Sequence, residues 1–137
     1  MDDDADDADI FCEALCRIAA SMKCMTAENG LKLFEILSED RPDVIFLDIN
    51  MPKLSGWETL RKLKDDTEYN NIPVIMYSTS SSRKDIEIAY GLGARLFITK
   101  PEDFRELSKI LEIVATGLGE EQISRLKEFA SVRVNLN

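Results

Sequence analysis

The sequence predicts an α/β fold in which a doubly wound parallel sheet carries helices on both faces. Short apolar runs alternate with segments of helical periodicity, which is the pattern of βαβ units. The runs at residues 44–47 and 74–77 are too short for helices and too apolar for half-exposed strands, so we expect strands buried on both faces. Asp48 follows the first run and Lys100 follows another at residues 95–99. Both are therefore expected at the carboxyl ends of strands, where such sheets bind ligands.

Periodicity and turn residues place the remaining elements. Helices are expected at residues 6–20, at 30–39, at 56–66, up to residue 91 and from Pro101 onward, with a short strand at 22–27. The hydroxyl-rich loop at residues 78–82 offers side chains that can cap a helix. Beyond residue 118 the spacing of apolar residues indicates an extra C-terminal helix and then a short strand at 132–136. We therefore expect one domain at residues 1–118 and an extension at 119–137.

Composition narrows the class of protein. The chain has 137 residues, of which 45% are hydrophobic and 31% charged, and this suits one soluble domain. Its net charge of −9 argues against a nucleic-acid-binding module, because phosphate affinity needs clustered lysine and arginine. No apolar stretch approaches the roughly 20 residues of a membrane span, and the start is rich in aspartate, unlike a signal peptide. We expect a cytoplasmic protein with no membrane partner.

Histidine and cysteine usage excludes several kinds of site. The chain has no histidine, so Ser-His-Asp and Cys-His catalysis, His-ligated metals and a phosphohistidine on this chain are excluded. Cys12, Cys16 and Cys24 form an odd and sparse set, which is typical of reduced core thiols and not of a disulfide framework.

A set of motifs follows one order along residues 2–116. It consists of the acidic pair Asp2-Asp3, the segment Phe46-Leu47-Asp48-Ile49-Asn50-Met51-Pro52 with Gly56, the segment Pro73-Val74-Ile75-Met76-Tyr77-Ser78-Thr79, and Gly93-Ala94 through Lys100-Pro101. In this order and spacing the motifs resemble the receiver domain of two-component response regulators, the family of the bacterial chemotaxis response regulator. The resemblance implies a flavodoxin-like fold and a phosphorylation site.

The resemblance implies that Asp48 is the phosphoacceptor and becomes an aspartyl phosphate in a Mg²⁺-dependent reaction. It further implies that Asp3 and Asp48 ligate Mg²⁺ through their carboxylates, Asn50 through its backbone carbonyl, and Asp2 through a water molecule. Chemistry supports such a set, since phosphoryl transfer needs an oxygen nucleophile, a hard cation and a positive group that balances the phosphoryl oxygens.

The resemblance also assigns roles to residues of the later motifs. Lys100 would contact the phosphoryl oxygens, and Ser78 would hydrogen-bond them, with Thr79 a lesser candidate. Phe97 occupies the family's aromatic switch position, and the phosphoryl group would draw in Ser78 while Phe97 turns inward. The family has a cis bond before the proline that corresponds to Pro101.

The function implied is that of a single-domain response regulator. It would accept a phosphoryl group from a histidine kinase or a histidine phosphotransfer protein and then change its contacts with a downstream protein, without nucleic acid. Two other functions stay open. One is a pseudo-receiver, an interaction module that is not phosphorylated. The other is a haloacid-dehalogenase-type phosphatase, which the residue at Asn50 disfavours because that class has a second aspartate there.

Each site residue also has a plainer interpretation. The aspartates at the start can be a solvated acidic tail, Asp48 a turn or helix cap, and Lys100 a surface lysine. Ser78 can be a helix cap, and Phe97 can be ordinary core. Only the whole constellation favours the functional interpretation.

One part of the pattern departs from the family. Receiver domains begin with a central apolar strand that ends in the acidic pair, and here no such strand precedes Asp2. The loss of a central strand should cost more than the roughly 5–15 kcal/mol by which a domain is stable. Three explanations are open: a start that lies upstream, replacement by the tail at residues 132–136, or exchange of elements between two chains in a homodimer.

Overall fold

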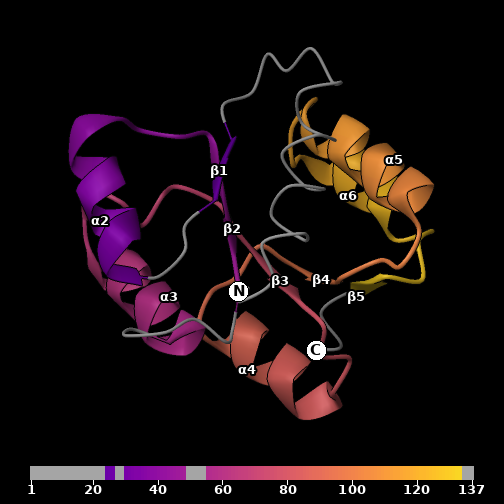
Figure 1. The fold of residues 1–137 in the computed structure, drawn as a ribbon, viewed down its shortest axis with the longest axis horizontal. Coiled ribbons are helices and arrows are strands. Elements are labelled where there is room, and N and C mark those ends of the chain that lie inside the picture. The colour runs from indigo at the N-terminus through magenta and orange to yellow at the C-terminus, as the bar shows by residue number, and fades with distance from the viewer. Residues whose placement is uncertain (1–23, 27–29, 49–54, 134–137) are drawn as a thin grey trace.

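The computed structural model describes residues 24–26, 30–48 and 55–133. Several predictions lie outside the described residues: the helix at 6–20, the acidic pair, Asn50 and the tail beyond residue 133. The described residues form one sheet with helices on both sides (Figure 1).

Within the described residues the sheet has five strands in the order β1-β2-β3-β4-β5. They are β1 (Cys24–Thr26), β2 (Val44–Leu47), β3 (Val74–Ser78), β4 (Leu96–Thr99) and β5 (Val132–Arg133). The strands β1 to β4 pair in parallel, and β5 pairs antiparallel with β4 at the edge of the sheet. The predicted parallel α/β fold is therefore confirmed.

Five helices lie within the described residues. They are α2 (Gly30–Glu39), α3 (Gly56–Asp65), α4 (Arg83–Gly91), α5 (Phe104–Val114) and α6 (Glu120–Leu126). Crossovers between parallel strands are nearly always right-handed, so strands in sequential order place their connecting helices on one face. Accordingly α2, α3 and α4 cover one face, and α5 and α6 cover the other (Figure 1).

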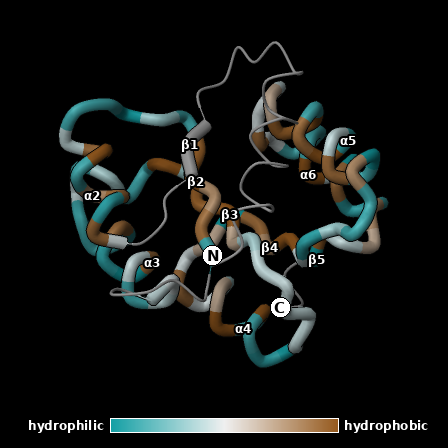
Figure 2. Tube along the Cα trace, viewed as in Figure 1, coloured by the Kyte–Doolittle hydropathy of each residue, from teal (hydrophilic) through white to brown (hydrophobic). Residues whose placement is uncertain are grey.

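Two apolar clusters fill the two faces of the sheet. The α2-side cluster joins buried side chains of α2, α3 and α4 to one set of strand side chains, and the α5-side cluster joins α5, α6 and β5 to the other set. Successive strand residues alternate between the clusters, as strand pleating requires. Ile45 and Leu47 belong to the α2 side, and Val44 and Phe46 to the α5 side. Figure 2 shows the resulting hydrophobic centre beneath more hydrophilic outer segments.

The predicted boundaries hold with one notable shift. Ser82 caps α4 by accepting a hydrogen bond from the backbone of Asp85, as the hydroxyl-rich loop suggested. The helix expected from Pro101 begins only at Phe104, because the Asp103 side chain caps it by accepting from the Arg105 backbone at 2.9 Å. A carboxylate at the positive end of a helix is a stronger start signal than the proline.

The pairing of β1 shows how the sheet is arranged without the central strand that the family has. β1 pairs directly with β2 over three residue pairs, from Cys24 with Val44 to Thr26 with Phe46. The suggestion that the tail replaces a central strand is wrong, because β5 lies beside β4, at the other edge of the sheet. The physical reason is burial: Val132 is buried while Arg133 is only half-buried, which suits an edge and not a slot covered on both faces.

In the part of the chain that the structure describes, no helix combines the length and the apolar character that crossing a membrane would require.

Candidate phosphoryl-transfer site

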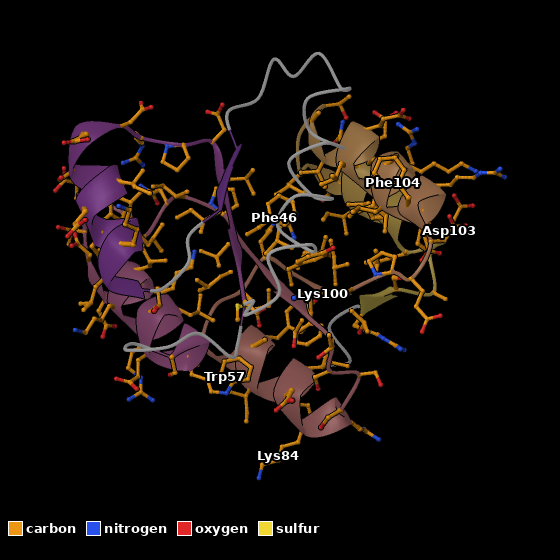
Figure 3. The ribbon with its side chains drawn as sticks, viewed as in Figure 1. Phe46, Trp57, Lys84, Lys100, Asp103 and Phe104 are labelled. Atoms are coloured by element: carbon orange, nitrogen blue, oxygen red, sulfur yellow. The ribbon has the colours of Figure 1, made fainter. Side chains whose placement is uncertain are left out.

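An ion pair joins the ends of two strands at the carboxyl edge of the sheet. Asp48 follows β2 and Lys100 follows β4, and Lys100 Nζ donates to Asp48 Oδ2 at 3.0 Å. The side chains are 13% and 10% exposed, so both charges are largely withdrawn from water. Figure 3 shows Lys100 directed inward over the sheet and not into solvent. The structure thus brings Asp48 and Lys100 into contact, as the sequence predicted.

An aromatic side chain on the α5 side lies against the ammonium group. Lys100 Nζ lies 5.5 Å from the centre of the Tyr77 ring, within the range of a cation–π contact. The Tyr77 ring in turn packs edge-on against Phe46, with 6.2 Å between the ring centres. Tyr77 was not predicted as a site residue. Tyr77 pairs with Ile98 on β4, and Lys100 lies two residues beyond Ile98, so side-chain alternation places Tyr77 and Lys100 on the same face.

Ser78 ends β3, between the two strands that carry the ion pair. It is fully buried, and its carbonyl accepts a hydrogen bond from the Lys100 backbone at 2.7 Å. Its Oγ accepts from the Ser80 backbone at 3.2 Å, which leaves the hydroxyl hydrogen able to donate elsewhere. The helix-cap interpretation of Ser78 does not hold, because Ser82 caps α4. Thr79 is exposed.

Phe97 is fully buried in the α2-side cluster. Its backbone N–H donates to the Tyr90 hydroxyl at 3.2 Å. The buried ring agrees with the interpretation of Phe97 as core, and its response to phosphorylation stays a prediction. The reason for the burial is packing, since β4 alternation directs Phe97 toward α4 while Leu96 and Ile98 face α5.

Tyr90 on α4 is a second residue that the sequence did not single out. Its hydroxyl donates to the backbone carbonyl of Arg133 while it accepts from Phe97. Burial raises the pKa of Tyr90 above its ordinary value, and the Phe97 hydrogen bond and the charge of Arg95 partly oppose this. The neutral hydroxyl therefore persists at physiological pH and holds three elements together.

Of the predicted Mg²⁺ ligands, Asp48 lies within the described residues. Asp2, Asp3 and Asn50 lie outside the described residues, and among the described residues no group of three or more acidic, cysteine or histidine side chains could hold a metal. Asp48 supplies one hard carboxylate at the predicted place. The bond between Lys100 and Pro101 is trans, contrary to the cis bond that the resemblance implied.

Comparison of the sequence with known protein families assigns the chain to one of them. The sequence pattern of the response regulator receiver domain matches residues 1–112. The chain belongs to this family. Receiver domains act as phosphoacceptor signalling modules and not as turnover enzymes.

Relatives with curated sequences support the assignment to the receiver family. Over 93 residues the chain is 37% identical to protein PilH of Pseudomonas aeruginosa, which covers 68% of this chain and 77% of that protein. Over 102 residues it is 32% identical to the polar-differentiation response regulator DivK of Brucella anthropi, with 74% and 80% covered. Two-component signalling by a receiver of response-regulator type is therefore established at the level of the family.

Solved receiver structures confirm the fold. The phosphorylated cyanobacterial phytochrome response regulator RcpA has a TM-score of 0.74 at 29% identity, with 96% of this chain and 94% of that chain covered. The chemotaxis response regulator CheY4 of Vibrio cholerae has a TM-score of 0.70 at 25% identity, with 81% and 91% covered. Receivers of this flavodoxin-like class have the strand order 2-1-3-4-5. The described strands of this receiver differ from that order, since β1 and β2 pair without a strand between them.

Proposed function

We propose that this receiver accepts a phosphoryl group on Asp48 and thereby switches its contacts with another protein. The observation that carries the proposal is the largely buried ion pair between Asp48 and Lys100 at the carboxyl edge of the sheet. A carboxylate held beside a fixed ammonium is a nucleophile whose product charge the ammonium partly balances. The donor would be the phosphohistidine of a histidine kinase or of a histidine phosphotransfer protein, since this chain has no histidine of its own.

The transfer step needs few parts. An oxygen of Asp48 attacks phosphorus, the phosphorus–nitrogen bond of the donor breaks, and its electron pair returns to the imidazole. Lys100 keeps its proton and moves its contact from the carboxylate to the phosphoryl oxygens. Ser78 donates its hydroxyl hydrogen to one of those oxygens, which its present bond to Ser80 allows.

Mg²⁺ fits the donors proposed for it. The Asp48 carboxylate is a hard oxygen ligand, and the resemblance adds the Asp3 carboxylate, the Asn50 backbone carbonyl and, through water, Asp2. When bound, the ion would neutralise the charge that gathers on the carboxylates and the phosphoryl oxygens. Lys100 alone, as one positive charge, would not balance a phosphoryl group.

We further infer a division of the chain and a location. Residues 1–118 would form the receiver unit and residues 119–137 an extension folded onto it. In support, the family match ends at residue 112, and the buried Leu126 and Val132 lie in the α5-side cluster. We propose the cytoplasm as its location, with a protein partner as output and with neither nucleic acid nor membrane as ligand.

The test is the intact mass of the protein after incubation with Mg²⁺ and acetyl phosphate, beside an Asp48→Ala variant. We expect the gain of one phosphoryl group in the natural chain, none in the variant and none after chelation of the metal. Circular dichroism of both proteins would show that the variant is folded. Labelling that persists in Asp48→Ala would move the acceptor to another residue.

A folded natural chain that gains no mass would instead favour the pseudo-receiver, which keeps the fold as an interaction module. The direct pairing of β1 with β2, without the family's central strand between them, is the observation that keeps this alternative in view. Size-exclusion chromatography of the same samples would test whether two chains exchange elements in a homodimer.

A further inference from the structure

The C-terminal strand β5 pairs with the edge of β4, the strand that Lys100 follows. In β5, Arg133 pairs with Phe97 and Val132 pairs with Ile98 (Figure 1). One backbone bond continues the ladder, since Thr99 N donates to the carbonyl of Ser131 at 2.8 Å. Two residue pairs are a short ladder, so further contacts must hold this strand in place.

A row of hydrogen bonds connects β5 with the proposed phosphoryl contact. Ser80 N donates to Ser78 Oγ at 3.2 Å, and the Ser80 carbonyl accepts from Thr99 Oγ1 at 2.9 Å. Thr99 Oγ1 in turn accepts from Arg133 Nε at 3.3 Å. Three consecutive hydrogen bonds therefore connect the Ser78 hydroxyl with Arg133 on β5, and Thr99 takes part in two of them.

Two further polar contacts anchor the same segment. The Tyr90 hydroxyl on α4 bridges the Arg133 carbonyl and the Phe97 backbone N–H. On the other side, the Ser131 hydroxyl contacts the carboxylate of Glu106 on α5. These contacts come from both faces of the sheet. The segment from Ser131 to Arg133 is therefore held at the edge of β4 by one residue of α4 and one of α5.

We propose that residues 131–133 form a latch on the β4 edge that opens when Asp48 is phosphorylated. The inference rests on the proposed function, because phosphorylation is its trigger. A phosphoryl group would recruit the Ser78 hydroxyl as a donor, and the Ser80 backbone bonded to that hydroxyl would move with it. Thr99 Oγ1 would then lose its acceptor and turn, and Arg133 Nε would lose its own.

Opening of the latch would expose the backbone edge of β4 next to the site. After loss of the Thr99 side-chain bond, β5 is held by two residue pairs, by the burial of Val132 and by the polar contacts of Tyr90 and Glu106. Because this ladder is short, we expect its opening free energy to lie at the low end for the molecule. Linkage makes the effect reciprocal: if phosphorylation favours the open latch, opening must favour the phosphorylated state by the same factor.

Amide hydrogen exchange followed by NMR tests the latch at single residues. The Thr99 amide donates to Ser131 in the latch, whereas the Lys100 amide donates to Ser78 on the β3 side and serves as an internal control. With Mg²⁺ and acetyl phosphate, we expect exchange at Thr99 to accelerate about fivefold or more while Lys100 changes little. Intact mass on the same sample reports phosphorylation.

The outcomes separate the two proposals. A phosphorylated sample in which Thr99 keeps its protection overturns the latch and leaves the proposed function standing. Absence of phosphorylation overturns the proposed function and with it the trigger.

A variant tests the coupling without any phosphoryl group. Thr99→Val keeps the size of the side chain and removes the hydroxyl that links Ser80 to Arg133. We expect exchange at this amide, which donates to the Ser131 carbonyl, to accelerate severalfold. The matched control is Thr116→Val, which removes a hydroxyl bonded to the Ile113 carbonyl at the end of α5. Equal effects of both substitutions on exchange at residue 99, or no effect of Thr99→Val there, would overturn the latch.

Discussion

β4 has two flanks that are held by different forces. On one flank it pairs in parallel with β3, from Ile75 with Leu96 to Ser78 with Thr99. These paired residues are buried between two helix layers, except Tyr77 and Thr99, which are half-buried. On the other flank it pairs with β5 over two residues, aided by side-chain hydrogen bonds from Tyr90 and Arg133. Apolar burial fixes the flank that carries the proposed phosphorylation site, and a few exchangeable polar bonds hold the flank that pairs with β5.

This difference between the flanks shows how one strand can be fixed on its β3 side and able to lose its partner on its β5 side. Hydrophobic burial is roughly proportional to area and does not depend on one particular bond. A hydrogen-bonded edge gives a smaller net stabilisation of about 0.5–1.5 kcal/mol per bond, and losing one bond shifts its population strongly. Four experiments with substituted proteins can break or sharpen this contrast.

The largest effect is expected where both flanks meet. Ile98 is fully buried and pairs with Tyr77 on β3 and with Val132 on β5. Ile98→Ala should lower the free energy of unfolding by about 2–5 kcal/mol, because it leaves a cavity in the α5-side cluster. Urea denaturation measures it. Leu31→Ala is the control, since Leu31 is 54% exposed and should matter by less than about 0.5 kcal/mol. A similar small loss for Ile98→Ala would contradict the packing described.

The ion pair should show an interaction energy of its own. A double-mutant cycle of Asp48→Asn and Lys100→Met should give a favourable coupling of about 0.5–3 kcal/mol in metal-free buffer, because both side chains are largely buried. Saturating Mg²⁺ should reduce the coupling, since the cation would also balance Asp48. Urea denaturation of the four proteins with and without Mg²⁺ tests both statements, and zero coupling in both buffers would show that the pair contributes nothing to stability.

Matched valines compare the two flanks directly. Val74 on β3 is fully buried and Val132 on β5 is 6% exposed, so the two side chains bury similar area. Val74→Ala should cost about 1–2 kcal/mol. Val132→Ala should cost less, because the short strand can open locally without global unfolding. If the two losses measured by urea denaturation were equal, β5 would be as firmly integrated as β3.

The smallest effect is expected at Tyr90 and depends on pH. Burial raises the pKa of Tyr90 in the folded state, so its stabilising contribution is complete below pH 10 and falls as the pH rises through the folded pKa. Tyr90→Phe should cost about 0.5–1.5 kcal/mol at pH 7 through the lost bond to Arg133. The difference between the two proteins in urea denaturation should shrink above pH 10. A constant difference from pH 7 to 11 would rule out this role of the hydroxyl.

Several elements could be predicted from local pattern. Continuous apolar runs placed β2 and β3 within the sheet, and the residues directly after such runs identified Asp48 and Lys100. The Ser82 cap was found as part of its hydroxyl-rich loop. These features depend on residues close in sequence, where periodicity and chain stereochemistry leave few choices.

Other features depend on partners far apart along the chain. The hydrogen bond from Tyr90 to Arg133 joins residues 43 positions apart, and no local pattern marks it. The place of β5 at the β4 edge and the direct pairing of β1 with β2 also follow from which strands reach one another in space. Sequence alternation at residues 132–136 indicated a strand but could not say which neighbour it would pair with.

The sequence by itself determined that the apolar runs form buried strands and where those strands end. A carboxylate and a lysine therefore meet at one edge of a parallel sheet, because pleating and apolar run length are local properties. Only the tertiary structure decided which strands are neighbours, that Phe97 packs in the α2-side cluster, and that Arg133 is bonded to Thr99, because these features depend on long-range packing among all the elements.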